Sequence, residues 1–237
     1  MVFFQNAGGT PANNLIEKNW IDGFFKTDEF SEALGMVWRN GYETKMYGYS
    51  YFHFTHKSQE IVKRFADFFG KEIKSRYRED KGYVEWYTYM KSSHPFIQKV
   101  KELGWTPIQE KSRAFPKGEF NKEVFVKTYI LMRHDLGTMK EKRKNNKIYV
   151  RPRLRIHGST DILEHLNEFM FEELGIKKKK LQTDKKISKA KTLYFQSYKD
   201  IESILKYTGA SETLETLYSF DLGFHDAEEF EKTRLQK

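Results

Sequence analysis

The sequence predicts an α+β protein in which one half-domain, with the element order αββαββα, occurs twice. The first observation is a repeat: the amphipathic segment 54–69 (FTHKSQEIVKRFADFF) reappears at 156–171 (IHGSTDILEHLNEFMF). Aligning Ile61 with Ile162 places the apolar residues of both segments on one face of a helix. The second observation is that segments rich in β-formers flank both copies. Because a period of about 100 residues is too long for a solenoid, a duplicated half-domain follows.

Length and composition agree with this fold class and exclude several others. With 237 residues, of which 38% are hydrophobic and 16% aromatic, the chain can bury a core and is too apolar to be disordered. The lack of cysteine excludes a disulfide scaffold, thiol catalysis and cysteine-ligated zinc. No long apolar run and no secretory signal are evident, so we expect an intracellular protein without a membrane partner. The formal net charge of +9 favours nucleic acid as the partner.

The first half-domain is predicted to span residues 1–104. Ser58 is a suitable N-cap for the repeated helix, and Gly104 is a suitable end for the last helix. The predicted elements are a helix over 13–30, a β-hairpin over 32–54 that turns near Asn40-Gly41, a helix over 54–69, strands over 71–80 and 83–91, and a helix over 94–104.

The second half-domain is predicted to span residues 121–209, after a linker over 105–120. Residues 210–237 are predicted to form an acidic, helical C-terminal extension. The predicted elements are a helix over 121–135, a β-hairpin over 136–156 that turns near Asn145-Asn146, a helix over 156–171, strands over 176–186 and 191–199, and a helix over 199–209.

Basic residues recur at every second position of several predicted strands. Arg151, Arg153 and Arg155 alternate with apolar residues, so the arginines share one face of a strand. The same spacing occurs over 74–78 and 177–179. We expect these faces to contact DNA, and we expect basic residues near the hairpin tips to hold phosphates. The predicted DNA-binding residues are Arg39, Lys45, Lys74, Arg76, Arg78, Arg143, Lys147, Arg151, Arg153, Arg155, Lys177 and Lys179.

Tyrosines also alternate along one face of the first predicted hairpin, at Tyr47, Tyr49 and Tyr51. Two interpretations stay open for them. The rings either stack on or hydrogen-bond to bases, or they extend the packing of the sheet.

The doubled element order and three segments resemble the LAGLIDADG homing endonucleases. WIDGFFKTDEF (20–30) resembles the signature helix of that family, with Gly23 at its central glycine, and segments 153–169 and 193–205 resemble later parts of its half-domain. The resemblance covers the chain up to about residue 209. It implies a monomer, without an obligate protein partner, whose two antiparallel sheets form a saddle on double-stranded DNA. It also implies that the two signature helices pack together through small residues, here Gly23 and Thr128.

The resemblance further implies a catalytic carboxylate at the end of each signature helix, which holds Mg²⁺ for phosphodiester cleavage. Counting from Gly23 assigns this role to Asp28. The same offset in the second half gives Arg133, which cannot bind Mg²⁺, and a two-residue shift gives Asp135. The prediction is therefore site-specific DNA binding with Mg²⁺-dependent cleavage through Asp28 and Asp135. The alternatives are a nicking enzyme, a catalytically inactive DNA-binding regulator and an intron RNA maturase.

Overall fold

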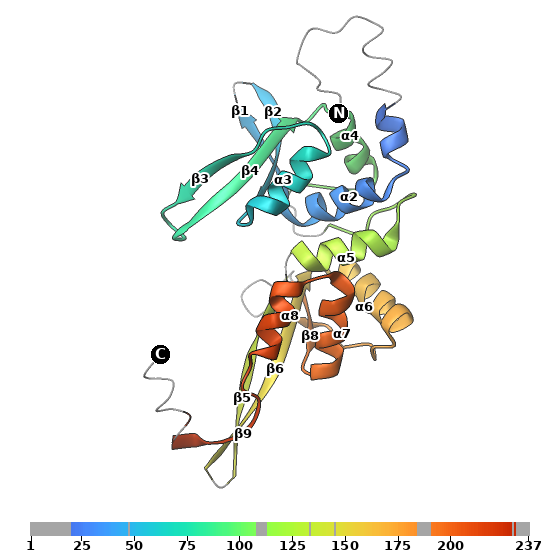
Figure 1. The fold of residues 1–237 in the computed structure, drawn as a ribbon. Helices are drawn as coiled ribbons and strands as arrows, with labels where there is room; N and C mark the ends of the chain where they lie inside the picture. Colours follow the sequence, from blue (N-terminus) through green and yellow to red (C-terminus); the bar gives the residue numbers. More distant parts are fainter. Residues whose placement is uncertain are drawn as a thin grey trace, which may run out of the picture. The chain divides into compact units, whose positions relative to one another are not determined.

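The computed structural model describes residues 20–46, 48–107, 113–132, 134–144, 146–183, 191–228 and 230. The chain divides into two compact units after Met132. Figure 1 labels most of the helices and strands of both units. In the described part of the chain, no helix is both long enough and apolar enough to cross a membrane.

The first unit contains a four-stranded antiparallel sheet with the strand order β1-β2-β4-β3 (Figure 1). The core lies on one face of this sheet, where Phe52 and Phe54 of β2 pack against Phe65 of α3. The elements are α2 (Asp28–Asn40), β1 (Gly41–Met46), β2 (Tyr49–His56), α3 (Gln59–Asp67), β3 (Lys74–Arg78), β4 (Tyr83–Lys91), α4 (Pro95–Glu102) and α5 (Lys122–Met132).

The second unit contains a sheet with the strand order β5-β6-β8-β7, and β9 pairs with β6 outside this path. Both units therefore pair the strands of their sheets in the same order along the chain, which agrees with the predicted α+β fold class of two antiparallel sheets. The elements are β5 (His134–Arg143), β6 (Lys147–Gly158), α6 (Thr160–Leu174), β7 (Gln182–Thr183), β8 (Lys191–Phe195), α7 (Tyr198–Thr208), α8 (Ser211–Tyr218) and β9 (Gly223–Asp226).

The start of the chain differs from the prediction. Residues 20–24 are helical, but a second helix, α2, begins at Asp28 and continues to Asn40. The predicted helix over 13–30 and the hairpin turn at Asn40-Gly41 are therefore wrong, and residues 13–19 lie outside the described residues. Thr27 starts α2 as its N-cap, since its hydroxyl accepts a hydrogen bond from the amide of Phe30.

Later elements agree better with the prediction. Strand β4 has the predicted bounds, and the second hairpin turns near the predicted residues, between Arg143 and Lys147. Of the predicted strand over 176–186, only 182–183 are strand among the described residues, as β7, and 184–186 lie outside the described residues. The C-terminal extension is only partly helical, because β9 follows α8 and joins the sheet.

A partly buried arginine holds the C-terminal end of α2. Arg113 donates hydrogen bonds to the carbonyl oxygens of Val37, Trp38 and Gly41, and its Nε donates to Thr106 at 2.6 Å. A helix end leaves such carbonyl groups without intrahelical partners. Burial lowers the pKa of Arg113 to about 10, so the guanidinium is still protonated at neutral pH.

We expect Arg113→Met to lower the free energy of unfolding by about 2 kcal/mol, because buried carbonyl groups lose their donor. Arg64→Met is the matched control, since Arg64 pairs with Glu32 on an exposed helix surface. Its expected cost is below about 1 kcal/mol. Urea denaturation followed by circular dichroism measures both values. Equal losses in the two variants would contradict a structural role for Arg113.

Helices α2 and α5 pack closely against each other at Gly35. A Cβ atom at this position would lie 2.9 Å from Cβ of Thr128 and 3.0 Å from the carbonyl oxygen of Phe125. Thr128 thus lies in the helix contact, as predicted, but its partner is Gly35. The assignment of Gly23 to this contact is wrong, because nothing lies within 4 Å of a Cβ built there.

Candidate nucleic-acid interface

Three basic side chains share the face of the first sheet that lies opposite its core. Lys74, Arg76 and Arg78 stand at alternate positions of β3. Their register partners in β4 are at odd-numbered positions, whereas the core residue Met90 is at an even-numbered one. Since side chains alternate between the two faces of a strand, the three basic side chains point away from the core. The alternation predicted for these residues is confirmed. We refer to the face of each sheet opposite its core as the open face.

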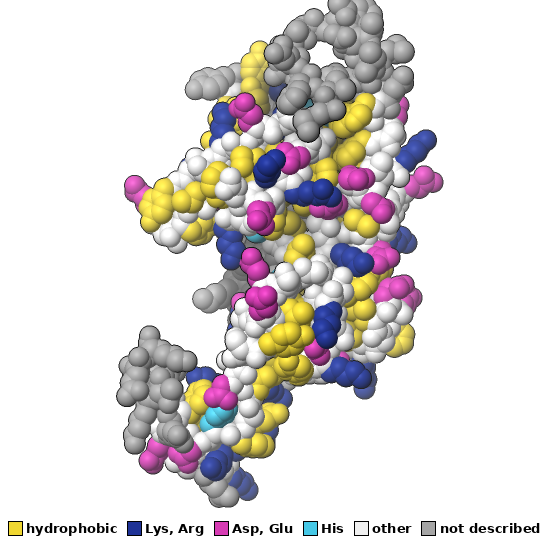
Figure 2. Space-filling view, in the orientation of Figure 1, with side chains coloured by type: hydrophobic (Ala, Val, Ile, Leu, Met, Phe, Trp, Pro, Cys, Tyr) yellow, Lys and Arg dark blue, Asp and Glu magenta, His cyan; other side chains and the backbone are white. Residues whose placement is uncertain are grey.

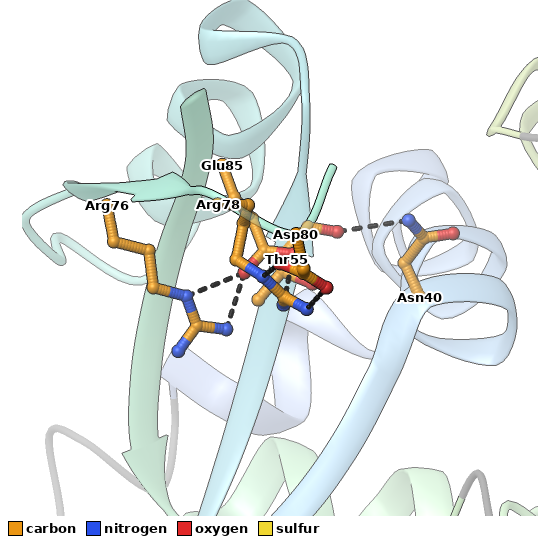
Figure 3. Close-up of polar contacts among 6 residues, drawn as sticks. All are labelled: Asn40, Thr55, Arg76, Arg78, Asp80 and Glu85. Carbon is orange, nitrogen blue, oxygen red and sulfur yellow. Dashed lines mark hydrogen bonds and ion pairs between the residues drawn. The ribbon is translucent and has the colours of Figure 1, made fainter. Parts of the chain in front are cut away.

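A carboxylate of β4 bridges two of these arginines (Figure 3). Glu85 Oε2 accepts a hydrogen bond from Arg76 Nε at 2.7 Å, and Glu85 Oε1 lies 3.5 Å from Arg78 Nη1. Arg78 also pairs with Asp80 at 2.9 Å. The hydrogen bond to Glu85 raises the pKa of Arg76. Glu85 is buried while Arg76 is half-exposed, so the carboxylate fixes a guanidinium that solvent can still reach.

Aromatic rings cover much of the remaining open face of the first sheet. Tyr42 stacks on His53 with 5.2 Å between the ring centroids. Tyr89 lies 5.7 Å from His53 and 6.0 Å from Tyr51. Burial lowers the pKa of His53, so this imidazole is neutral at neutral pH. Because these rings contact one another, Tyr51 extends the packing of the sheet. Tyr49 is 64% exposed, and Tyr47 lies outside the described residues.

The second sheet carries an arginine stripe on its open face, formed by Arg151, Arg153 and Arg155 of β6. The residues between them, Pro152 and Leu154, are buried, which confirms the predicted alternation. About a third of each arginine side chain is exposed, between 27% and 36%. Opposite Arg153, β5 has a glycine at 137, where a Cβ atom would lie 3.3 Å from the guanidinium. The glycine therefore leaves room for this side chain.

Asp135 of β5 lies within the arginine stripe rather than at a helix end. Its Oδ2 is 2.5 Å from Nη2 of Arg155 and 3.6 Å from Nη2 of Arg153. The prediction that a shift brings Asp135 to the end of the helix is wrong, because α5 ends at Met132 and Asp135 belongs to a strand. Arg133 lies outside the described residues.

A second carboxylate of β5 makes the same kind of bridge. Glu141 Oε2 accepts hydrogen bonds from Arg151 at 3.1 Å and from Arg143 at 3.0 Å. With Glu85 and Asp135, three carboxylates on the open faces therefore each contact two arginines. Sequence reasoning missed these bridges. The only available signal was the presence of acids in strands next to the basic ones, and it does not reveal the register.

The basic residues at the hairpin tips differ in their positions. Arg143 and Lys147 flank the turn of the second hairpin, as predicted, and face each other in register. Lys147 also lies 3.9 Å from Asp226 of β9. Lys45 is near the tip of the first hairpin, but its register partner is Ser50. This pairing places Lys45 on the core side of the sheet rather than on the open face.

Three predicted DNA contacts lie elsewhere in the fold. Arg39 belongs to α2, not to a hairpin tip, and its guanidinium lies 5.6 Å from the ring centroid of Tyr129. Lys177 and Lys179 precede β7 and belong to no strand. Lys179 Nζ pairs with Asp200 of α7 at 2.8 Å, on the core side of the sheet. The prediction of a basic strand at 177–179 is wrong, because the segment is bound by helix side chains.

The last turn of α2 carries no carboxylate. Its final residues are 38–40 (WRN), and Asn40 Nδ2 donates a hydrogen bond to the carbonyl oxygen of Thr55 at 3.0 Å (Figure 3). Asp28 is the first residue of α2, where it accepts a hydrogen bond from Asn121 at 2.8 Å. The prediction that Asp28 ends a signature helix is therefore wrong.

The sequence matches no protein-family model and no curated protein. Among solved structures, the meganuclease I-SmaMI bound to uncleavable DNA aligns with a TM-score of 0.53 and 12% identity, over 81% of this chain and 88% of that chain. The I-SmaMI LAGLIDADG homing endonuclease bound to cleaved DNA aligns with a TM-score of 0.52 and 13% identity, over 81% and 89%. I-SmaMI bound to an uncleaved target with calcium ions gives 0.52 and 13%, over 81% and 90%. These alignments show a shared fold.

Proposed function

We propose that this chain, which shares the fold of the LAGLIDADG homing endonucleases, binds double-stranded DNA through the open faces of its sheets and does not cleave it. The observation that carries the proposal is the arginine stripe. Three guanidinium groups lie on one strand face, and carboxylates of the neighbouring strand hold them in place. Arginine pairs bidentately with guanine in the major groove and with phosphates. The solved structures with the same fold are bound to DNA, which supports this partner.

The distribution of charge supports the same surface. Over the helices that Figure 2 shows, acidic and basic side chains are interspersed. Ion pairs that involve helix residues of the second unit include Lys178 with Glu168 and Lys206 with Glu202. On the open face of the second sheet, by contrast, Asp135 and Glu141 each contact two arginines, so basic groups outnumber acidic ones. An excess of arginine on a strand face is an electrostatic footprint of a nucleic-acid interface.

Neither Asn40, at the end of α2, nor Asp135, in β5, fits a catalytic magnesium site. The amide of Asn40 is engaged by a backbone carbonyl, and the carboxylate of Asp135 is shared by two guanidinium groups. Within the described residues, no group of three or more His, Asp or Glu side chains could hold a metal ion. Because Mg²⁺ prefers carboxylate oxygens, this donor set favours the DNA-binding regulator over the endonuclease.

A supercoiled plasmid tests the proposal. It carries the DNA that flanks the gene, is incubated with the protein and Mg²⁺, and is stripped of protein before electrophoresis. We expect retardation before stripping and unchanged supercoiled DNA afterwards. Linear or nicked product would contradict the absence of cleavage. In that case Asp135→Asn shows whether the carboxylate in the arginine stripe supplies the activity.

A second measurement tests the kind of nucleic acid. Duplex DNA and duplex RNA of the same sequence compete for the protein in a gel retardation assay. We expect DNA to win, because the A-form major groove is too deep and narrow for strand side chains. A preference for RNA would favour the maturase alternative instead.

A further inference from the structure

Strand β9 extends the second sheet beside the arginine stripe. It pairs antiparallel with the start of β6, with Phe224 opposite Tyr149 and Asp226 opposite Lys147. Tyr149 is two residues from Arg151 on the same strand, so its side chain points to the open face. Residues opposite each other in a ladder share a face. Phe224 therefore lies on the same face as the arginine stripe.

Phe224 is strongly exposed for an apolar residue in a regular strand. At 70%, it has the largest exposed fraction among the large hydrophobic side chains of the described chain. One side of its ring meets Tyr149, with 4.7 Å between the centroids. Tyr149 in turn lies 5.9 Å from the guanidinium of Arg143. The outer surface of the ring stays in water, where it contributes no burial to folding.

The chemistry around this ring indicates what it contacts in a complex. Arg143 lies over the neighbouring ring of Tyr149, and Lys147 lies opposite Asp226 in the same ladder, 3.9 Å from its carboxylate. The two cations suit a polyanion, while the phenyl ring itself can make neither a hydrogen bond nor an ion pair. Among the base edges that line the major groove, the C5-methyl group of thymine is the apolar one. An exposed phenyl ring on a DNA-facing strand matches this methyl group rather than a phosphate or a polar edge.

We propose that Phe224, supported by Tyr149, contacts the C5-methyl group of a thymine in the bound duplex and makes the protein prefer thymine at that position. This inference rests on the proposed function, since it requires the open face to lie on DNA. It assigns a role in sequence readout to the C-terminal segment of the chain.

The test begins with a binding site that the wild-type protein selects from a random duplex library. A set of variant sites is then made, and in each of them deoxyuridine replaces one thymine. Each replacement removes one methyl group and keeps the base pair. At the thymine that Phe224 contacts, we expect this replacement to lower the affinity of the wild-type protein about fourfold, as the loss of one buried methyl group predicts. Phe224→Ala is expected to bind the thymine site about tenfold more weakly than wild type and to show no further loss with deoxyuridine at that position.

Phe171→Ala is the matched control. Phe171 is an exposed phenylalanine of α6 in the same unit, it is 47% exposed, and its ring also lies near a lysine, Lys178. We expect this variant to bind both sites like wild type. The salt dependence of Phe224→Ala should equal that of wild type, because a phenyl ring releases no counterions. Phe224→Leu, which keeps an apolar side chain, should retain most of the affinity, and thermal melting checks that each variant is folded.

The outcomes separate this inference from the function on which it rests. If wild type binds no duplex at all, both fail. If it binds, but Phe224→Ala keeps full affinity, only the role of Phe224 is overturned. If Phe224→Ala weakens binding while no deoxyuridine substitution affects wild type, the ring contacts another group, and the thymine assignment is overturned.

Discussion

Gly35→Val is expected to lower the free energy of unfolding of the first unit by about 3 kcal/mol, at the upper end of the cost of overpacking a close contact. A Cβ atom at Gly35 would stand 2.9 Å from Cβ of Thr128 and 3.0 Å from the carbonyl oxygen of Phe125. The second of these is backbone, so no side-chain rotation relieves it. Valine adds two methyl groups to this clash. Helices α2 and α5 must then separate, which exposes apolar surface between them.

Gly23→Val is the matched control for this substitution. Nothing lies within 4 Å of a Cβ at Gly23, and the expected change in unfolding free energy is below about 0.5 kcal/mol. A smaller substitution, Gly35→Ala, should also lower the free energy of unfolding. Adding Thr128→Gly to it should restore part of that loss, because this change removes the nearest atom from the contact. Denaturant unfolding monitored by tryptophan fluorescence measures all variants. A loss at Gly23 equal to that at Gly35 would contradict the helix contact described here.

The contrast between these two glycines shows why the sequence alone assigned the helix contact to the wrong segment. Segment 20–30 contains a glycine among aromatic residues and resembles a signature helix, whereas the residues of α2 include the β-formers Val37 and Trp38. The dipeptide Asn40-Gly41 is also a strong hairpin signal. In the fold both residues serve the junction of helix and strand. Asn40 donates to Thr55, and a Cβ at Gly41 would lie 2.6 Å from the ring of Phe52.

The α+β fold class with two antiparallel sheets was predictable because it depends on apolar periodicity, and small errors in the bounds of an element do not change that periodicity. A local capping signal starts α6, since the Ser159 hydroxyl accepts a hydrogen bond from the amide of Ile162. The next helix of this unit ends at the predicted Gly209, with φ of 71°. Such signals are local in the chain. They therefore fix elements and their order without showing which strands exchange side-chain contacts.

The positions of the candidate site residues were predictable only where the alternation within a single strand determines which face a side chain occupies. The alternation of Arg151, Arg153 and Arg155 with buried residues follows from the period of a strand. The roles of Asp135 and Lys179 depend on neighbours that are distant in sequence. Asp135 meets arginines 18 and 20 residues away across a ladder, and Lys179 meets a carboxylate of α7. Neither contact has a signature in the local sequence, and both change the predicted function of the residue.

Arg153→Ala combined with Arg155→Ala is expected to weaken the binding of duplex DNA by about 100-fold, since each well-placed arginine contact contributes about 1–3 kcal/mol. If both side chains hold phosphates, the slope of log K against log salt concentration should also become shallower by about 2. The cost to folding should stay below about 1 kcal/mol, because the pairs with Asp135 are partly exposed. Fluorescence anisotropy at several salt concentrations measures the binding, and thermal melting measures the folding.

The matched control removes the same amount of positive charge from the same unit, at two exposed lysines outside the arginine stripe. Lys178→Ala with Lys206→Ala deletes two cations that are also paired with carboxylates, Glu168 and Glu202. If only the net charge of the chain mattered, both double variants would lose the same affinity. A loss confined to the arginine variant, on every duplex sequence alike, assigns Arg153 and Arg155 to phosphates. A larger loss on the selected site than on random DNA assigns them to base edges, because only base contacts distinguish sequences.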